Sequence, residues 1–99
     1  MKELSSIEEL NKDKISIIKF GAIWCGSCRE IQFKLENLIS SFPSLDFWSL
    51  DVDEHLDIAD SYKVNELPVV IAFKKGKEIS RWDESVGDIA DWLKFLVSF

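Results

Sequence analysis

A run of β-branched and apolar residues leads directly into two closely spaced cysteines in the stretch Ile15-Ser16-Ile17-Ile18-Lys19-Phe20-Gly21-Ala22-Ile23-Trp24-Cys25-Gly26-Ser27-Cys28. Its first part, residues 15–20, is typical of a strand that is buried on both faces. After the second cysteine, apolar residues recur at the spacing of one helical face until a proline ends the pattern: Ile31, Leu35, Leu38, Ile39, Phe42 and Pro43. The cysteine pair therefore lies where a buried strand gives way to an amphipathic helix.

The rest of the chain alternates between helical and strand patterns. Ser5 and Ser6 are each followed three residues later by a glutamate, which predicts a capped first helix to about Asn11. The other expected elements are strands at 45–52, 69–73 and 78–82, a short helix capped by Asp53, a turn at 74–77 and a last helix from about Gly87. Helices between strands imply parallel neighbours, and the last hairpin adds an antiparallel edge. We therefore expect one α/β domain over residues 1–99, with a mixed sheet covered by helices on both faces.

The composition excludes several classes of protein. Eighteen acidic residues against twelve basic ones give a net charge of −6, which disfavours binding to nucleic acid or to an anionic membrane. No apolar run approaches the roughly 18 residues of a membrane span. Residues 1–14 lack the apolar core of a secretory signal. These features predict a small globular protein of the cytoplasm.

Two cysteines are too few for a disulfide framework, and the loop that they close is too small for much entropic stabilisation. They therefore suggest either a metal clip or a reversible redox pair. A structural zinc site needs four ligands, and the chain offers only one histidine, His55, on a different predicted helix. We therefore expect no metal site within the chain, which leaves open only a zinc ion shared between molecules. The aromatic residue before the pair favours redox chemistry over two inert buried thiols.

A position at the start of a helix gives the two thiols different roles. The free N–H groups and the helix dipole lower the pKa of the Cys25 thiol, and the thiolate is the nucleophile. Cys28 follows one turn later and can resolve the mixed disulfide that Cys25 forms with a partner, while Gly26 leaves room for the approach. The product is a Cys25–Cys28 disulfide, which a reductase must reduce.

The motif Trp24-Cys25-Gly26-Ser27-Cys28 resembles the thioredoxin active site, Trp-Cys-Gly-Pro-Cys, at four of five positions. The similarity continues over nearly the whole chain, in the segments Phe20–Cys25, Leu50–Glu54, Leu67–Pro68 and Phe73–Lys77. It implies a small thioredoxin fold with a central mixed sheet of four to five strands. It also implies a protein-disulfide reductase and electron carrier that binds no cofactor, acts on disulfide-containing clients and takes electrons from a flavin-dependent thioredoxin reductase. We expect a monomer.

The same resemblance indicates the surface that binds clients. Pro68 occupies the position of the family's cis-proline, which implies a cis Leu67–Pro68 bond opposite the cysteines. The backbone around Leu67 would then pair with an extended client segment. Ile23, Trp24 and Val86 are candidates for an apolar rim beside Leu67. The remaining tryptophans are expected to pack in the interior: Trp48, Trp82 and Trp92.

Three positions depart from the family pattern. Ser27 replaces the proline of the motif and can donate a hydrogen bond to a thiolate, so we expect a somewhat more oxidising couple than the ~−270 mV of thioredoxin. Lys19 replaces a buried aspartate that is taken to relay a proton from the resolving cysteine, and Ser49 replaces the lysine beside it. Two interpretations of Lys19 are open. Its stem either covers apolar surface with the ammonium in water, or it lies behind Cys28 and accepts its proton, with Asp51 as counter-ion.

Two other functions are compatible with these residues. One is a more oxidising, isomerase-like protein with the same dithiol, although the lack of a signal segment favours a reducing compartment. The other is a thioredoxin-fold binding module whose cysteines do not turn over. The changes at Lys19 and Ser49 favour the binding module, whereas the intact motif and Leu67-Pro68 favour the reductase.

Overall fold

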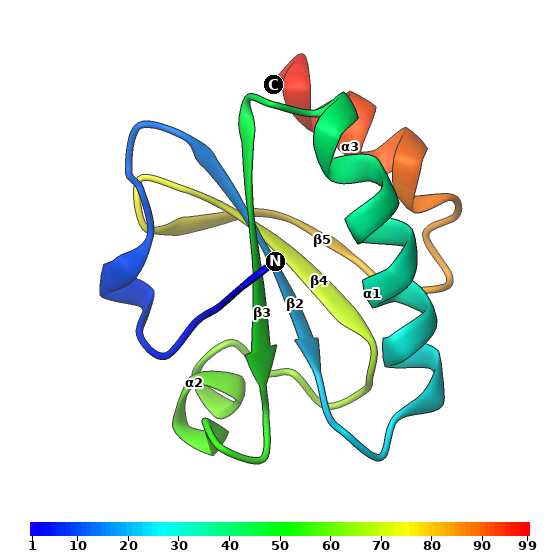
Figure 1. The fold of residues 1–99 in the computed structure, drawn as a ribbon. Coiled ribbons are helices and arrows are strands. Elements are labelled where there is room, and N and C mark those ends of the chain that lie inside the picture. Colours follow the sequence, from blue (N-terminus) through cyan, green and yellow to red (C-terminus); the bar gives the residue numbers. More distant parts are fainter.

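The computed structural model describes residues 1–99 and contains one mixed β-sheet between helices (Figure 1). The strands lie in the order β1-β3-β2-β4-β5, with the bounds Lys2–Glu3 (β1), Ile15–Gly21 (β2), Leu45–Asp51 (β3), Val69–Lys74 (β4) and Lys77–Trp82 (β5). Strand β3 is parallel to β1 and β2, whereas β4 is antiparallel to β2 and β5. The predicted fold class, including the antiparallel hairpin, is confirmed.

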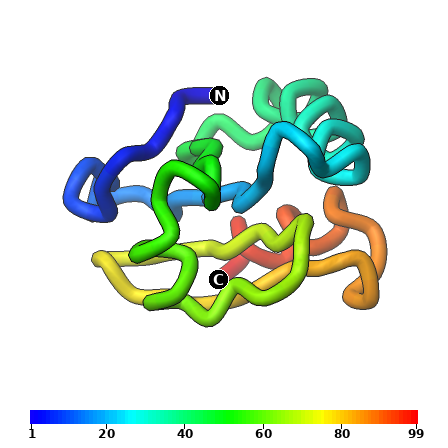
Figure 2. The backbone as a smooth tube through the Cα atoms, turned by 90° about the horizontal axis from the view of Figure 1, so that it is seen from below, coloured from blue at the N-terminus to red at the C-terminus, as the bar shows by residue number.

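Helices cover both faces of this sheet. Their bounds are Ile7–Glu9 (η1, a 3-10 turn), Gly26–Leu38 (α1), Ile39–Ser41 (η2, a second 3-10 turn), Leu56–Ser61 (α2) and Ile89–Val97 (α3). In Figure 2, α1 and α3 lie on one side of the molecule, and η1 and α2 lie on the other. None of these helices combines the length and the apolar character that a membrane span requires.

The N-terminal segment differs from the prediction. The chain opens with strand β1, whose two exposed residues pair in parallel with Trp48 and Ser49 of β3. Because backbone pairing alone defines this strand, no apolar pattern announces it in the sequence. The expected capping box is present between Ser6 and Glu9, but it opens only the short 3-10 turn η1. A first helix to Asn11 was therefore wrong, because the chain leaves helical geometry at Leu10.

Strand β2 separates two apolar cores, because its side chains alternate between the faces of the sheet. Ile17 packs with side chains of α1 and α3, whereas Ile18 and Phe20 pack with side chains on the face that carries α2. All three are fully buried, so the prediction of a strand buried on both faces is confirmed. The remaining tryptophans lie in these cores as expected: Trp48, Trp82 and Trp92.

The end of β2 positions the cysteines. β2 ends at Gly21, and residues 22–25 lead to Gly26, the first residue of α1. Parallel strands end at the same edge of a sheet, so the segment that follows β3 reaches this edge too. The loop before β4, with Leu67 and Pro68, also lies at this edge (Figure 1). Residues far apart in the sequence are thereby gathered around the cysteine pair.

Candidate active site

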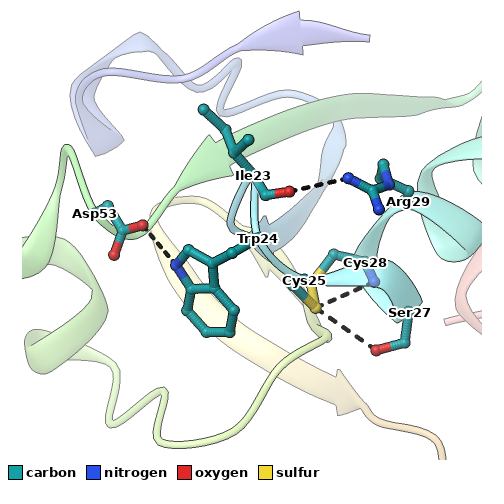
Figure 3. Close-up of a disulfide and its surroundings, with 7 residues drawn as sticks. All are labelled: Ile23, Trp24, Cys25, Ser27, Cys28, Arg29 and Asp53. Atoms are coloured by element: carbon teal, nitrogen blue, oxygen red, sulfur yellow. Dashed lines mark hydrogen bonds between the residues drawn. A yellow bond between two sulfur atoms is a disulfide. The ribbon is translucent and has the colours of Figure 1, made fainter.

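Cys25 and Cys28 form a disulfide at the N-terminus of α1, with their Cα atoms 5.3 Å apart. Cys25 is the N-cap residue, and its Sγ accepts the backbone N–H of Cys28 at 3.2 Å (Figure 3). Cys28 is 1% exposed and Cys25 is 7% exposed. The more accessible cysteine is therefore the N-cap residue, at the end of the helix where backbone N–H groups favour a thiolate.

The hydroxyl of Ser27 also lies beside the Cys25 sulfur. Its Oγ lies 3.5 Å from the Sγ of Cys25, within hydrogen-bond distance for sulfur (Figure 3). Gly26 has no neighbouring atom within 4 Å of the point that a β-carbon would occupy, so this position is open to the surface. The expectation that glycine relieves crowding at Gly26 is therefore not what the structure shows.

Trp24 is held beside the disulfide by an acidic residue. The indole Nε1 donates to Oδ2 of Asp53 at 2.8 Å, although the ring itself is 70% exposed (Figure 3). Asp53 had been expected to cap α2. It does not, because α2 begins at Leu56 and the preceding residue, His55, makes no side-chain cap. No pattern in the sequence distinguishes an aspartate that caps a helix from one that accepts an indole N–H across two loops.

A second polar contact holds the loop before Trp24. Arg29, from the first turns of α1, donates from Nη1 to the backbone carbonyl of Ile23 at 3.1 Å. The Ile23 side chain is 81% exposed. Arg29 was not predicted as a site residue, because its partner is a backbone carbonyl, which no sequence pattern indicates.

The Leu67–Pro68 peptide bond is cis, as the resemblance implied. Leu67 and Trp24 line a surface depression of about 480 Å³ that exposes the cysteine motif. The other residues that line it are Cys25, Gly26, Ser27, Val52, Val64 and Asn65. Val86 is exposed but does not line this depression. The structure thus brings four of the five motif residues together with Leu67 and leaves Val86 and Ile23 outside, with Ile23 lining the cavity beside Lys19 instead.

Lys19 lies behind the disulfide and is only 8% exposed. It projects from β2 beside Gly21, which allows it to approach Cys28. Burial lowers the pKa of Lys19, while the negative charges of Glu36 and Asp51 oppose that shift. The structure thus places Lys19 behind Cys28 and not with its amine extended into bulk solvent, whereas its role as a proton acceptor stays a hypothesis.

The structure offers no evident metal centre. No group of three or more His, Cys, Asp or Glu side chains is arranged to hold a metal ion. His55, to which the sequence gave no role, lines a cavity together with Lys19.

Comparison with known proteins gives a consistent result. The thioredoxin family model matches residues 4–95. Thioredoxin-1 of Saccharomyces cerevisiae is 39% identical over 70 residues, which are 71% of this chain and 68% of that protein. The H-type thioredoxin of Fagopyrum esculentum is 40% identical over 68 residues, which are 69% of this chain and 59% of that protein.

Similarity to solved structures extends further along the chain. The thioredoxin of Fasciola hepatica superimposes with a TM-score of 0.81 and 31% identity, and the match covers 95% of this chain and 97% of that one. Among the curated relatives, in contrast, the aligned segment of several spans little more than half of their length.

Proposed function

Because the chain belongs to the thioredoxin family, we propose that it is a thiol–disulfide oxidoreductase that reduces disulfide bonds in client proteins. The observation that carries the proposal is the Cys25–Cys28 disulfide at the N-terminus of α1. A disulfide that closes so short a loop has little structural value, whereas a reversible dithiol requires the two sulfurs to be this close.

In the first step, Cys25 is the nucleophile. In the disulfide form, the Cys25 sulfur accepts the backbone N–H of Cys28, and the same donor would stabilise negative charge on the reduced sulfur. The thiolate attacks one sulfur of a client disulfide, forms a mixed disulfide and releases the other client sulfur as a thiolate.

In the second step, Cys28 is the resolving thiol. Its thiolate attacks Cys25 Sγ, so the Cys25–Cys28 bond forms and the bond between Cys25 and the client breaks. The chain loses two electrons and the client gains them. Burial keeps Cys28 away from external disulfides, which favours this division of roles.

We assign client binding to the depression beside the motif. Leu67 and Pro68 would offer backbone groups to an extended client segment, because the residues before β4 are not covered by another strand at this edge. The exposed side chain of Trp24 would add apolar contact within the depression, and the exposed Ile23, which lines the neighbouring cavity, would extend this apolar surface. No bound cofactor takes part, because the two sulfurs carry the electrons.

The proposal also includes the electron donor of the chain, its cellular compartment and its oligomeric state. A flavin-dependent thioredoxin reductase would return two electrons to the disulfide and close an electron-transport cycle. The reducing cytoplasm is the compartment in which such a dithiol acts as a reductant, and the chain would work there as a monomer. Reduction by a purified reductase, sedimentation of the purified chain and localisation of a fluorescent fusion test these three points separately.

The first experiment is a redox titration of the Cys25/Cys28 couple in defined thiol–disulfide buffers, followed by Trp24 fluorescence. A reversible two-electron transition between about −270 and −230 mV supports a reductant. A transition near about −180 mV or above supports the isomerase-like alternative. Two thiols that remain free throughout would contradict the proposal and leave a binding module.

A trapping experiment tests the roles of the two cysteines. Cys28→Ser removes the resolving thiol, so the mixed disulfide with a client should accumulate and be visible on a non-reducing gel. Cys25→Ser is the matched control and should accumulate none. Trapping by Cys25→Ser instead would reverse the assignment of nucleophile and resolving thiol.

A further inference from the structure

Lys19 is the only charged residue that the fold buries. Thirty per cent of the residues are charged. Of all polar and charged residues, only Lys19 and the uncharged Ser16 are buried. Burying an ammonium group costs folding free energy unless other groups compensate. A lysine retained in the interior at such a cost, behind a reactive disulfide, calls for a chemical explanation.

Gly21 shows how close Lys19 lies to the resolving cysteine. The point that a β-carbon on Gly21 would occupy is 3.2 Å from Cβ of Cys28 and 3.3 Å from Nζ of Lys19. The amine and the cysteine therefore converge on the same small space, from β2 and from α1 respectively. A side chain at position 21 would separate them, so the glycine makes their approach possible.

A cavity connects this space with solvent. It has a volume of about 440 Å³ and is lined by Lys19, Gly21 and Ser49, together with Asp51 at the end of β3. Its other titratable lining groups come from three further segments: Glu3 of β1, Arg29 of α1, and the neighbouring Glu54 and His55 after β3. The cavity is open enough for water to reach the amine, whereas Cys28 itself is closed off.

The charges around Lys19 are balanced in a way that suits proton transfer. Burial lowers the pKa of Lys19 and so raises the fraction of neutral amine. Glu36 of α1 and Asp51 of β3 act in the opposite direction, because they stabilise the ammonium once it forms. The amine can therefore take up a proton and also hold it.

We propose that Lys19 is the group that receives the proton of Cys28 when Cys28 resolves the mixed disulfide. The proton passes from the Cys28 sulfur to neutral Nζ of Lys19, and the resulting thiolate attacks Cys25 Sγ. The Cys25–Cys28 bond forms, the client leaves as a thiolate, and the ammonium returns its proton to water in the cavity. This inference rests on the proposed function, because it concerns the second step of that reaction.

The test separates the two steps with a small disulfide, 5,5′-dithiobis(2-nitrobenzoate), in stopped flow. The reduced chain releases one coloured thiolate when Cys25 attacks and a second when Cys28 resolves. Lys19→Met keeps a stem of similar length without the amine, so the second release should slow about 100-fold while the first is unchanged. Lys34→Met, on the exposed side of α1, is the matched control and should leave both rates unchanged.

Lys19→Arg separates proton transfer from charge. Arginine keeps the positive charge but does not give up a proton in proteins, so the second release should remain slow. A full rate in Lys19→Arg, or in Lys19→Met, would overturn the inference. Circular dichroism establishes that each variant is folded before its rate is compared.

The pH profile supplies a test that does not require Lys19 to be replaced. The rate of the second release should rise with pH as Lys19 loses its proton. Asp51→Asn removes a charge that raises the pKa of Lys19, so this rise should move to lower pH. An unmoved profile, or one moved to higher pH, would contradict the inference. If the wild-type chain releases both thiolates but reduces no protein disulfide, the proposed function is what fails.

Discussion

Ser27 is the residue at which this active site departs from the family motif, and its hydroxyl lies 3.5 Å from the Cys25 sulfur. A hydroxyl that donates to this sulfur stabilises the thiolate and thus the reduced form. Ser27→Pro removes the hydroxyl and stiffens the first turn of α1. We expect the midpoint potential of the couple to become more negative, as measured by titration in thiol–disulfide buffers.

Ser27→Ala is the control for this prediction, because it removes the hydroxyl without introducing a ring. A part of the shift should already be present in Ser27→Ala if the hydrogen bond contributes. A Ser27→Pro potential equal to the wild type, or less negative, would show that residue 27 does not set the potential in this way.

At the scale of the element, α3 shows how a single cap stabilises a helix that completes a core. Asp88 is its N-cap, and the carboxylate accepts the backbone N–H of Ala90 at 2.7 Å. The helix buries four side chains against the sheet: Ile89, Trp92, Leu93 and Leu96. Asp88→Ala should lower the free energy of unfolding by about 1 kcal/mol, as measured by urea denaturation.

Asp91 provides the comparison within the same helix. It is also an acid in the first turn, but it makes only an exposed pair with Lys94 at 4.0 Å. Asp91→Ala should therefore cost about 0.5 kcal/mol or less. If Asp88→Ala and Asp91→Ala lowered the free energy of unfolding by the same amount, then charge at the helix N-terminus, and not the cap hydrogen bond, would stabilise α3.

At the scale of the whole molecule, the buried Lys19 should make stability depend on pH. Its pKa in the folded chain is lower than the ordinary value of 10.5, because burial disfavours the ammonium. Below the folded pKa, the folded state carries the full cost of the buried charge. As the pH rises through the folded pKa towards the unfolded value, the unfolded chain binds more protons than the folded one, and the cost disappears.

Lys19→Met should therefore be more stable than the wild type at neutral pH, and the difference should narrow as the pH rises above the folded pKa of Lys19. Urea denaturation at a series of pH values measures this, and Lys34→Met should show no such narrowing. A Lys19→Met chain that is less stable than the wild type at pH 7 would argue that the amine stabilises the fold.

Much of this arrangement could be predicted because it depends on local chemistry. The pattern of residues 15–20 predicted the buried strand, and the recurrence of Ile31 and Leu35 predicted α1. The cis bond before Pro68 followed from the family motif. Strand β1 could not be predicted, because two exposed residues carry no periodicity and only pairing with β3 defines them. The contact between Asp53 and Trp24 was missed for a related reason, since it joins two loops through side chains alone.

The amino-acid sequence by itself therefore determined the order of the elements from β2 onward, the burial of β2 on both faces and the position of Cys25 at a helix start. Each of these depends on residues that are close together in the chain. Tertiary structure alone decided whether the amine of Lys19 would extend into bulk solvent or lie behind Cys28 at the wall of a cavity. Both outcomes suit the same local sequence, and the packing of α1 over Gly21, with Asp51 at the next strand end, selects the buried one.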